Sequence, residues 1–128
     1  MTPLILIVDD DADLRRALRR QLERAAYEVA EADSPASALS TMASAPPDVV
    51  ISDVMMPGGN GLDFYPRLIA EHPALEGRVI FLTGIADDPL VSSRIEEIGA
   101  PLLGKLEDLA VVVDAVRLAL FRRGRAAC

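Results

Sequence analysis

The sequence has little of several residue types that define whole classes of protein. Its single cysteine, Cys128, is the last residue, so no disulfide framework can form within the chain. This composition fits a protein of a reducing compartment. Its single histidine, His72, follows an expected helix end in a polar segment, which favours a surface position over a role as catalytic base. Apolar runs are strand-sized or broken by charge, so we expect no transmembrane span, no signal peptide and a cytoplasmic location.

Positive charge is also scarce. The net charge is −7, the calculated pI is about 4.6, and the twelve arginines are scattered along the expected helices rather than gathered into a patch. We therefore do not expect nucleic acid as a direct partner. The densest basic run lies on the helix expected at 12–26 and is interpreted as a solvated helix face, made of Arg15, Arg16, Arg19, Arg20 and Arg24.

The chain does contain enough apolar sequence for one domain. Its 128 residues are 51% hydrophobic, which allows a single core and leaves no room for a second domain. We expect that domain to span residues 1–123, followed by a short C-terminal tail at 124–128.

Two of the apolar runs end in carboxylates. The run at 4–8 (LILIV) stops at Asp9 and Asp10, and the run that begins at Val49 leads to Asp53, after which proline and glycine break the chain. In a parallel sheet that helices cover on both faces, the carboxyl ends of the strands open at the crevice where ligands bind. We therefore expect these acids to meet at one edge of the sheet.

Such a cluster suits a divalent cation. Carboxylates brought together repel one another unless a cation neutralises them, and an all-oxygen cluster suits a hard ion such as Mg²⁺. We predict a Mg²⁺ site at Asp9, Asp10 and Asp53. The neighbouring Asp11 and Asp13 are instead predicted to cap the helix that follows.

Strands and helices alternate five times along the chain. The connections are too short for anything but right-handed parallel crossovers, which predicts an α/β fold with a doubly wound, parallel five-stranded sheet. The strand order 2-1-3-4-5 would place the switch point between strands one and three, beside the acids. Pro66 lacks an N–H and is expected to bend or delay the first turn of the third helix. The strands are expected at 4–8, 27–32, 48–53, 78–82 and 101–103, and the helices at 12–26, 35–44, 62–71, 90–98 and 109–123.

Two more polar side chains follow later strands. Thr83 comes after the strand at 78–82, and Lys105, the only lysine, comes just past the strand at 101–103. An ammonium there can pair with Asp53 or with an anion bound to it. A carboxylate nucleophile, metal-binding acids, a hydroxyl and an ammonium around one crevice suit phosphoryl transfer to a carboxylate. The set contains no obvious general base, which argues for a phosphorylated state that lasts.

The motifs ILIVDDD, SDVMMPGGNG and FLTG, together with the isolated lysine, resemble the receiver domain of bacterial two-component response regulators. They fall in that family's order and spacing over nearly the whole chain. The resemblance implies a flavodoxin-like (βα)5 three-layer sandwich with Mg²⁺ as cofactor. It also implies a phosphoacceptor that takes its phosphoryl group from a histidine kinase or phosphotransfer protein and signals to a downstream protein target. We therefore expect a signalling switch rather than an enzyme, with at most slow self-phosphorylation and autodephosphorylation.

Carried over residue by residue, the resemblance gives three side chains a part in the chemistry. Asp53 matches the phosphoaccepting aspartate of the family. Thr83 matches the hydroxyl that moves to hydrogen-bond the phosphoryl group, and Lys105 matches the lysine that pairs with it. These three are the expected catalytic set.

The resemblance also assigns the metal ligands. Asp10 matches the acid that binds Mg²⁺ directly, Asp9 its partner that acts largely through water, and Met55 the residue that offers a backbone carbonyl, with Asp53 completing the set. The apolar Met55 side chain is expected to lie beside the path of attacking water, which it cannot orient. Slow autodephosphorylation is the hypothesis that follows.

Three departures from the family pattern surround Lys105. The family usually has proline after this lysine, often with a cis bond, whereas here Leu106 follows. A cis bond before a non-proline residue costs roughly 2.5–4 kcal/mol, so we expect a trans bond with a shifted Lys105, or local strain. Leu102 stands where the family commonly has an aromatic residue, and the segment 99–105 is one residue shorter than the common pattern.

Other functions remain as alternatives. The chain could be a pseudo-receiver, a protein-interaction module whose acids no longer cycle phosphate, or a phosphatase of the haloacid dehalogenase type. Phosphatases of that type have a second aspartate two residues after the nucleophile, where this chain has Met55. The chain could stand alone or belong to a larger protein such as a hybrid histidine kinase.

A homodimer is a further candidate assembly, through the face made by the fourth and fifth helices and the fifth strand. The apolar stripe at Leu109, Val113 and Val116 could serve it, although such a stripe more often packs into the core.

Overall fold

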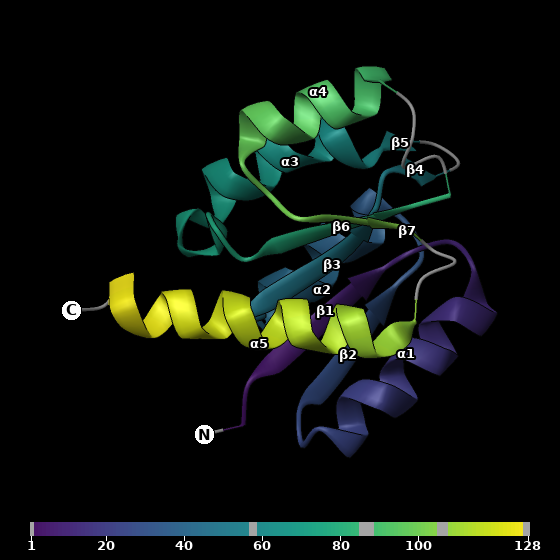
Figure 1. The fold of residues 1–128 in the computed structure, drawn as a ribbon, viewed down its shortest axis with the longest axis vertical. Helices are drawn as coiled ribbons and strands as arrows, with labels where there is room; N and C mark the ends of the chain where they lie inside the picture. The colour runs from purple at the N-terminus through teal and green to yellow at the C-terminus, as the bar shows by residue number, and fades with distance from the viewer. Residues whose placement is uncertain (1, 57–58, 85–88, 105–107, 127–128) are drawn as a thin grey trace.

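The computed structural model describes residues 2–56, 59–84, 89–104 and 108–126, and its centre is a parallel sheet of five strands (Figure 1). In space the strands follow the order β2-β1-β3-β6-β7, which is 2-1-3-4-5 when the strands of this sheet are counted along the chain. The predicted fold is therefore confirmed. The strands are β1 (Leu4–Val8), β2 (Glu28–Ala32), β3 (Val49–Asp53), β6 (Val79–Thr83) and β7 (Leu102–Gly104).

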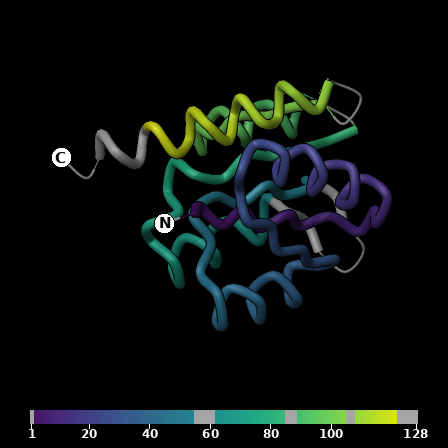
Figure 2. The backbone as a smooth tube through the Cα atoms, turned by 90° about the horizontal axis from the view of Figure 1, so that it is seen from below, coloured from purple at the N-terminus to yellow at the C-terminus, as the bar shows by residue number. Residues whose placement is uncertain are grey.

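Helices cover both faces of this sheet. One core cluster joins the sheet to α1 and α5, and a second joins its other face to α2, α3 and α4. Figure 2 shows α2 and α5 at opposite sides of the molecule, with the sheet between them. The helices are α1 (Ala12–Arg24), α2 (Pro35–Ser44), α3 (Gly61–Glu71), α4 (Pro89–Ile98) and α5 (Leu109–Ala126), and a short 3₁₀ turn spans Pro73–Leu75.

The alternation of side chains along each strand explains the two clusters. On β1, Ile5 and Ile7 point to the α1 and α5 side, whereas Leu6 and Val8 point to the opposite side. All five residues of β3 are buried, as expected for a central strand of a sheet covered on both faces. The stripe at Leu109, Val113 and Val116 packs into the first cluster, so its interpretation as core is the correct one.

Helix boundaries follow from capping groups that are visible in the sequence. The Asp11 carboxylate accepts hydrogen bonds from the backbone N–H groups of Asp13 and Leu14, at 3.0 and 3.2 Å, so the predicted cap is confirmed for Asp11. Likewise, Ser34 Oγ accepts from the N–H of Ser37 at 3.1 Å. Helix α1 ends two residues before the predicted Ala26, because Ala26 has a left-handed φ of 70° that a right-handed helix cannot include.

Other parts of the fold also differ from the sequence-based expectation, most of them by one residue at an element boundary. Helix α3 begins at Gly61 and contains Pro66, so the proline does not delay the start of the helix. Helix α5 runs to Ala126, past its predicted end at residue 123 and across the predicted start of the tail; the domain division there stays a prediction. In the turn after β3, the two-residue strands β4 (Met55–Met56) and β5 (Gly59–Asn60) form an antiparallel pair that was not predicted.

Within the described ranges, none of the helices combines the length and the apolar character that crossing a bilayer requires.

We predict that Ile51→Ala lowers the free energy of unfolding by about 2–5 kcal/mol. Ile51 is fully buried in the central strand β3, and its truncation leaves a cavity that the surrounding sheet cannot close. Urea unfolding of the variant and the wild type measures the change. The control is Leu118→Ala on α5, where the side chain is 61% exposed, and its effect is expected to stay within about 0.5 kcal/mol. Equal effects of the two substitutions would contradict the described core.

Candidate functional site

Three carboxylates meet at the carboxyl end of the sheet. The register of β1 and β3 pairs Val8 with Ser52, so the residues that follow these two, Asp9 and Asp53, reach the same edge. Asp9 and Asp53 are only 1% and 2% exposed, whereas Asp10 is exposed. One carboxylate oxygen from each of the three lies within 4.8 Å of the others. The structure thus brings together the acids that the sequence predicts to be metal ligands.

Backbone hydrogen bonds hold Asp9 in this position. Its N–H donates to the carbonyl oxygen of Ala32 at 3.0 Å, which continues the pairing of β1 with β2 beyond the end of the strand. Its Oδ1 atom accepts from the N–H of Asp11 at 2.9 Å. The acidic loop between β1 and α1 is therefore built by local bonds that leave few orientations to the Asp9 carboxylate.

The remaining predicted site residues divide between described and undescribed parts of the chain. Thr83 is the last residue of β6, is 1% exposed, and pairs in register with Gly104. Lys105 directly follows Gly104 in the sequence but lies outside the described residues, as does its bond to Leu106. Met55 opens β4, where its backbone pairs with Asn60. Leu102, which replaces the usual aromatic residue, is partly buried against the α4 side of the core.

The acid cluster fits Mg²⁺ in both chemistry and spacing. Mg²⁺ prefers oxygen ligands at about 2.0–2.1 Å, so ligands on opposite sides of the ion lie about 4 Å apart. Oxygens within 4.8 Å of one another are therefore close to the spacing that such an ion requires. The two buried carboxylates repel each other in a region of low dielectric constant, which favours a bound cation further.

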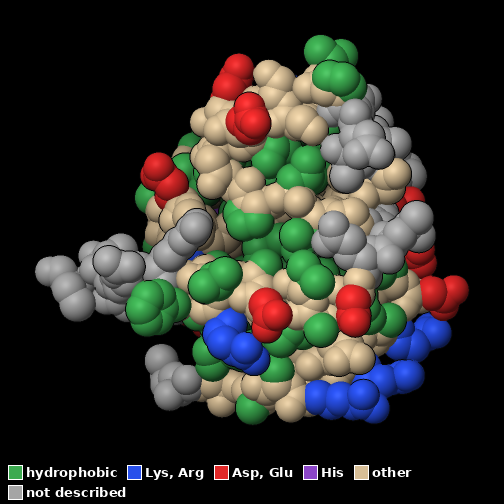
Figure 3. Space-filling view, viewed as in Figure 1, with side chains coloured by type: hydrophobic (Ala, Val, Ile, Leu, Met, Phe, Trp, Pro, Cys, Tyr) green, Lys and Arg blue, Asp and Glu red, His purple; other side chains and the backbone are tan. Residues whose placement is uncertain are grey.

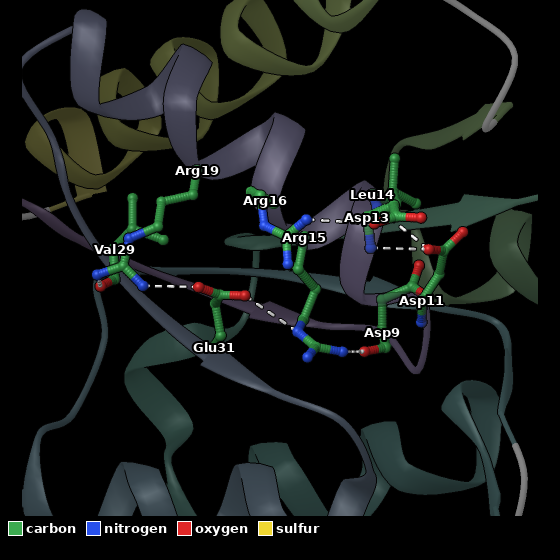
Figure 4. Close-up of polar contacts among 9 residues, drawn as sticks. All are labelled: Asp9, Asp11, Asp13, Leu14, Arg15, Arg16, Arg19, Val29 and Glu31. Carbon is green, nitrogen blue, oxygen red and sulfur yellow. Dashed lines mark hydrogen bonds and ion pairs between the residues drawn. The ribbon is translucent and has the colours of Figure 1, made fainter.

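Two arginines of α1 contact β2 (Figure 4), Arg15 with a side chain that is 17% exposed and Arg19 with one that is 42% exposed. Arg15 donates from Nε to Glu31 Oε1 at 3.0 Å and from Nη1 to the carbonyl oxygen of Asp9 at 2.6 Å. Arg19 donates to Glu31 Oε2 at 2.6 Å and to the carbonyl oxygen of Val29 at 3.3 Å. The interpretation of this basic run as a solvated face is therefore wrong for Arg15, whose side chain is 17% exposed. It holds only in part for Arg19, and Arg16, Arg20 and Arg24 are exposed.

The ion pairs change the titration of Glu31. Burial alone would raise the pKa of its carboxyl, but hydrogen bonds from Arg19 and Arg15 outweigh that effect and lower the pKa below its usual value. The hydrogen bond to Glu31 in turn raises the pKa of Arg19. Glu31 is therefore a charged, partly buried link between α1 and β2.

The sequence contained a signal for this network. Arg15 and Arg19 are four residues apart and so lie on one face of α1. In the alternating segment at 27–32, Glu31 shares a side of the strand with Val29, which packs toward α1. An acid on the helix-facing side of an edge strand, opposite two arginines at helical spacing, predicts an ion pair between the two elements.

Comparisons with known proteins agree on one family. The family model of the response regulator receiver domain matches residues 5–117. The chain is 37% identical over 137 residues to a protein-glutamate methylesterase/protein-glutamine glutaminase of Anaeromyxobacter dehalogenans, covering 98% of this chain but 38% of that protein. It is 31% identical over 118 residues to the response regulator receiver protein CpdR of Brucella abortus, covering 90% of this chain and 97% of that one. The chain therefore matches nearly the whole length of the second relative but only about a third of the first.

The solved structures agree with the fold. The chain is similar to the signal receiver domain of an HD domain-containing protein from Pseudomonas fluorescens, with a TM-score of 0.85 and 28% identity over 98% of this chain and 92% of that one. It is also similar to the chemotaxis protein CheY4 of Vibrio cholerae, with a TM-score of 0.82 and 25% identity over 93% and 99% of the two chains.

We predict that Glu31→Gln destabilises the protein by about 1–2 kcal/mol at pH 7, because the two arginines lose a charged acceptor. The lowered pKa of Glu31 means that its stabilising contribution is present above the pKa of the unfolded chain, near 4.3, and is lost as the pH falls through the folded value. The difference between variant and wild type should therefore shrink in urea unfolding below about pH 4.

Glu23→Gln is the matched control for this prediction. Glu23 also pairs with Arg19, at 3.3 Å, but its side chain is 54% exposed, so the loss should stay below about 1 kcal/mol. A Glu31→Gln effect that did not change with pH would show that the charge of Glu31 contributes nothing.

Proposed function

We propose that this chain, which belongs to the response regulator receiver domain family of two-component systems, accepts a phosphoryl group on Asp53 from a histidine kinase or phosphotransfer protein. The strongest support is the cluster of Asp9, Asp10 and Asp53 at one edge of the sheet, with two of the three carboxylates buried. The chain acts as a switch between phosphorylated and unphosphorylated states, not as a catalyst of repeated turnover. A cytoplasmic location agrees with the single cysteine at position 128.

Asp9, Asp10 and Asp53 would hold Mg²⁺, together with the backbone carbonyl of Met55. When bound, the ion neutralises negative charge on the phosphoryl oxygens. By the resemblance to the family, Asp10, the exposed member of the set, would bind the ion directly, and Asp9 would act largely through water. Asp53 is buried at the end of β3, with a carboxylate oxygen within 4.8 Å of those of Asp9 and Asp10.

The phosphoryl transfer is a nucleophilic displacement at phosphorus. A carboxylate oxygen of Asp53 forms a bond to the phosphorus of a phosphohistidine donor, and the bond from phosphorus to the imidazole nitrogen breaks. The electron pair of that bond stays on the imidazole nitrogen, which then takes a proton. The product is an aspartyl phosphate on Asp53.

Two more side chains would bind this phosphoryl group. Thr83, the buried last residue of β6, donates a hydrogen bond from its hydroxyl, and Lys105 supplies a compensating ammonium. The apolar side chain of Met55 cannot orient an attacking water, so autodephosphorylation is slow.

Phosphorylation would be reported at the face of α4, β7 and α5, to a downstream protein target or a second copy of the chain. A groove of about 290 Å³ lies between the sheet and α5, lined by Val79, Leu103, Val111, Ala115 and Leu118 among others. Figure 3 shows hydrophobic side chains gathered on this side of the molecule. The exposed side chains of Leu118 and Phe121 extend the apolar surface along α5. Leu90 is an exposed apolar side chain on α4.

We predict that acetyl phosphate adds one phosphoryl group to the protein in the presence of Mg²⁺, and that Asp53→Asn abolishes the addition, because the amide is not a nucleophile of comparable strength. Intact mass spectrometry measures the adduct, with EDTA in place of Mg²⁺ as the metal control. Asp33→Asn is a matched variant, since Asp33 is an exposed carboxylate of the same edge of the sheet. It should leave the addition unchanged.

A different pattern would select another function. No adduct with acetyl phosphate or with a phosphorylated histidine kinase would favour the pseudo-receiver, whose acids do not cycle phosphate. An adduct that persists in Asp53→Asn would place the phosphoacceptor elsewhere.

We predict that phosphorylation promotes homodimer formation through α5, and that Leu118→Glu weakens it at least tenfold by placing a charge in the apolar contact. Sedimentation velocity with and without acetyl phosphate and Mg²⁺ measures the association. The control, Ala43→Glu, adds the same charge to an exposed position of α2 on the opposite side of the sheet. A dimer unaffected by Leu118→Glu, or none after complete phosphorylation, would remove the homodimer from the proposal.

A further inference from the structure

Arg15 connects the acidic edge of the sheet to the ion pairs on β2. It lies in the first turns of α1, and its guanidinium bonds the Asp9 carbonyl oxygen on one side and Glu31 on the other (Figure 4). Its side chain is only 17% exposed, so the bonds form in a partly dehydrated environment. The fork of a guanidinium can make both bonds at once in fixed directions.

The bond to Asp9 fixes a peptide unit that leads to a metal ligand. The carbonyl of Asp9 and the N–H of Asp10 belong to one planar unit, which also contains both Cα atoms. Holding the carbonyl at 2.6 Å therefore restricts the direction in which the Asp10 side chain leaves the backbone. On its other side Asp9 is held by its N–H, which donates to Ala32 at 3.0 Å.

Glu31 in turn fixes Arg15. Its carboxylate receives Arg15 at 3.0 Å and Arg19 at 2.6 Å, and Arg19 is itself anchored to the Val29 carbonyl at 3.3 Å. Glu31 of β2 thus holds the Arg15 guanidinium in the position from which it contacts the acidic loop. Partners of this kind, one step removed from a metal, orient its ligands and set its affinity.

We propose that Arg15 is a positioning residue for the divalent cation site, with Glu31 holding Arg15 in place. This role rests on the proposed Mg²⁺ binding by Asp9, Asp10 and Asp53. Within the acidic loop, Arg15 bonds the Asp9 carbonyl oxygen of the backbone, so this bond positions the loop without occupying a carboxylate oxygen of Asp9. The ion gains affinity because the loop is ordered before binding.

The sign of the effect separates positioning from charge. A guanidinium is positive, so by Coulomb's law alone its removal would tighten the binding of a nearby cation. Loss of a positioning contact instead weakens binding, because the acidic loop must then be ordered at the moment the ion binds. Arg15→Gln is therefore expected to raise the dissociation constant for Mg²⁺, roughly tenfold.

Isothermal titration with Mg²⁺ alone measures this change on the unphosphorylated protein. The matched control is Arg16→Gln, which removes the same charge from the next residue, whose side chain is 69% exposed and pairs only with Asp13 among the described residues. Its dissociation constant should stay within about twofold of the wild type. Arg15→Lys should also bind weakly, since one ammonium keeps the charge but cannot span both partners.

A second measurement separates the metal from the chemistry. Weaker metal binding predicts that Arg15→Gln needs more Mg²⁺ for half-maximal phosphorylation by acetyl phosphate, while the rate at saturating Mg²⁺ approaches that of the wild type. Glu31→Gln leaves Arg15 in place but loosens it, so its Mg²⁺ affinity should fall less than that of Arg15→Gln. Circular dichroism shows whether each variant is folded. If Arg15→Gln does not fold, the Mg²⁺ affinity of Glu31→Gln tests the proposal instead.

Opposite outcomes overturn the proposal in distinguishable ways. If the wild type binds Mg²⁺ and Arg15→Gln binds it equally or more tightly, the positioning role is wrong while the proposed function stands. If the wild type itself binds no Mg²⁺, the metal part of the proposed function fails and the role of Arg15 fails with it.

Discussion

The register between the parallel strands β1 and β3 decides where each carboxylate of the site lies. Because Val8 pairs with Ser52, the acids at the carboxyl ends of both strands arrive at one edge of the sheet, two of them buried. Side chains alternate between the faces of a strand, so a slip of one residue would send the apolar side chains of β3 to the wrong layers. The two core clusters therefore fix the acid cluster as well as the fold.

Packing and charge oppose each other at this edge. The core requires β1 and β3 side by side, and this brings together carboxylates that repel in a chain with a net charge of −7. Arg15 brings positive charge to the region through the backbone of Asp9, and Glu31 keeps that charge in place. A partly buried ion pair is thus placed where it contributes to both folding and the site.

The sequence predicts the parts of this arrangement that depend on local patterns. Apolar runs that end in acids located β1 and β3, and Asp11 predicted the start of α1. The link from Arg15 to Asp9 escaped prediction because it depends on the rotation of α1 relative to β2, which only packing sets. The end of α1 was misjudged because Ala26 adopts a left-handed backbone, for which alanine gives no signal. The β4 and β5 pair is too short to have a periodicity.

The length of β7 has a consequence for how copies of the chain can associate. This edge strand has three residues, ending at Gly104, against five in each of the other strands of the sheet. Few backbone groups are offered along so short an edge, so a second chain gains little by adding its own strand there. Aggregation by continuation of the sheet is disfavoured on this side. The association through α5 proposed above would then rest on side-chain contacts and would not extend the sheet on this side.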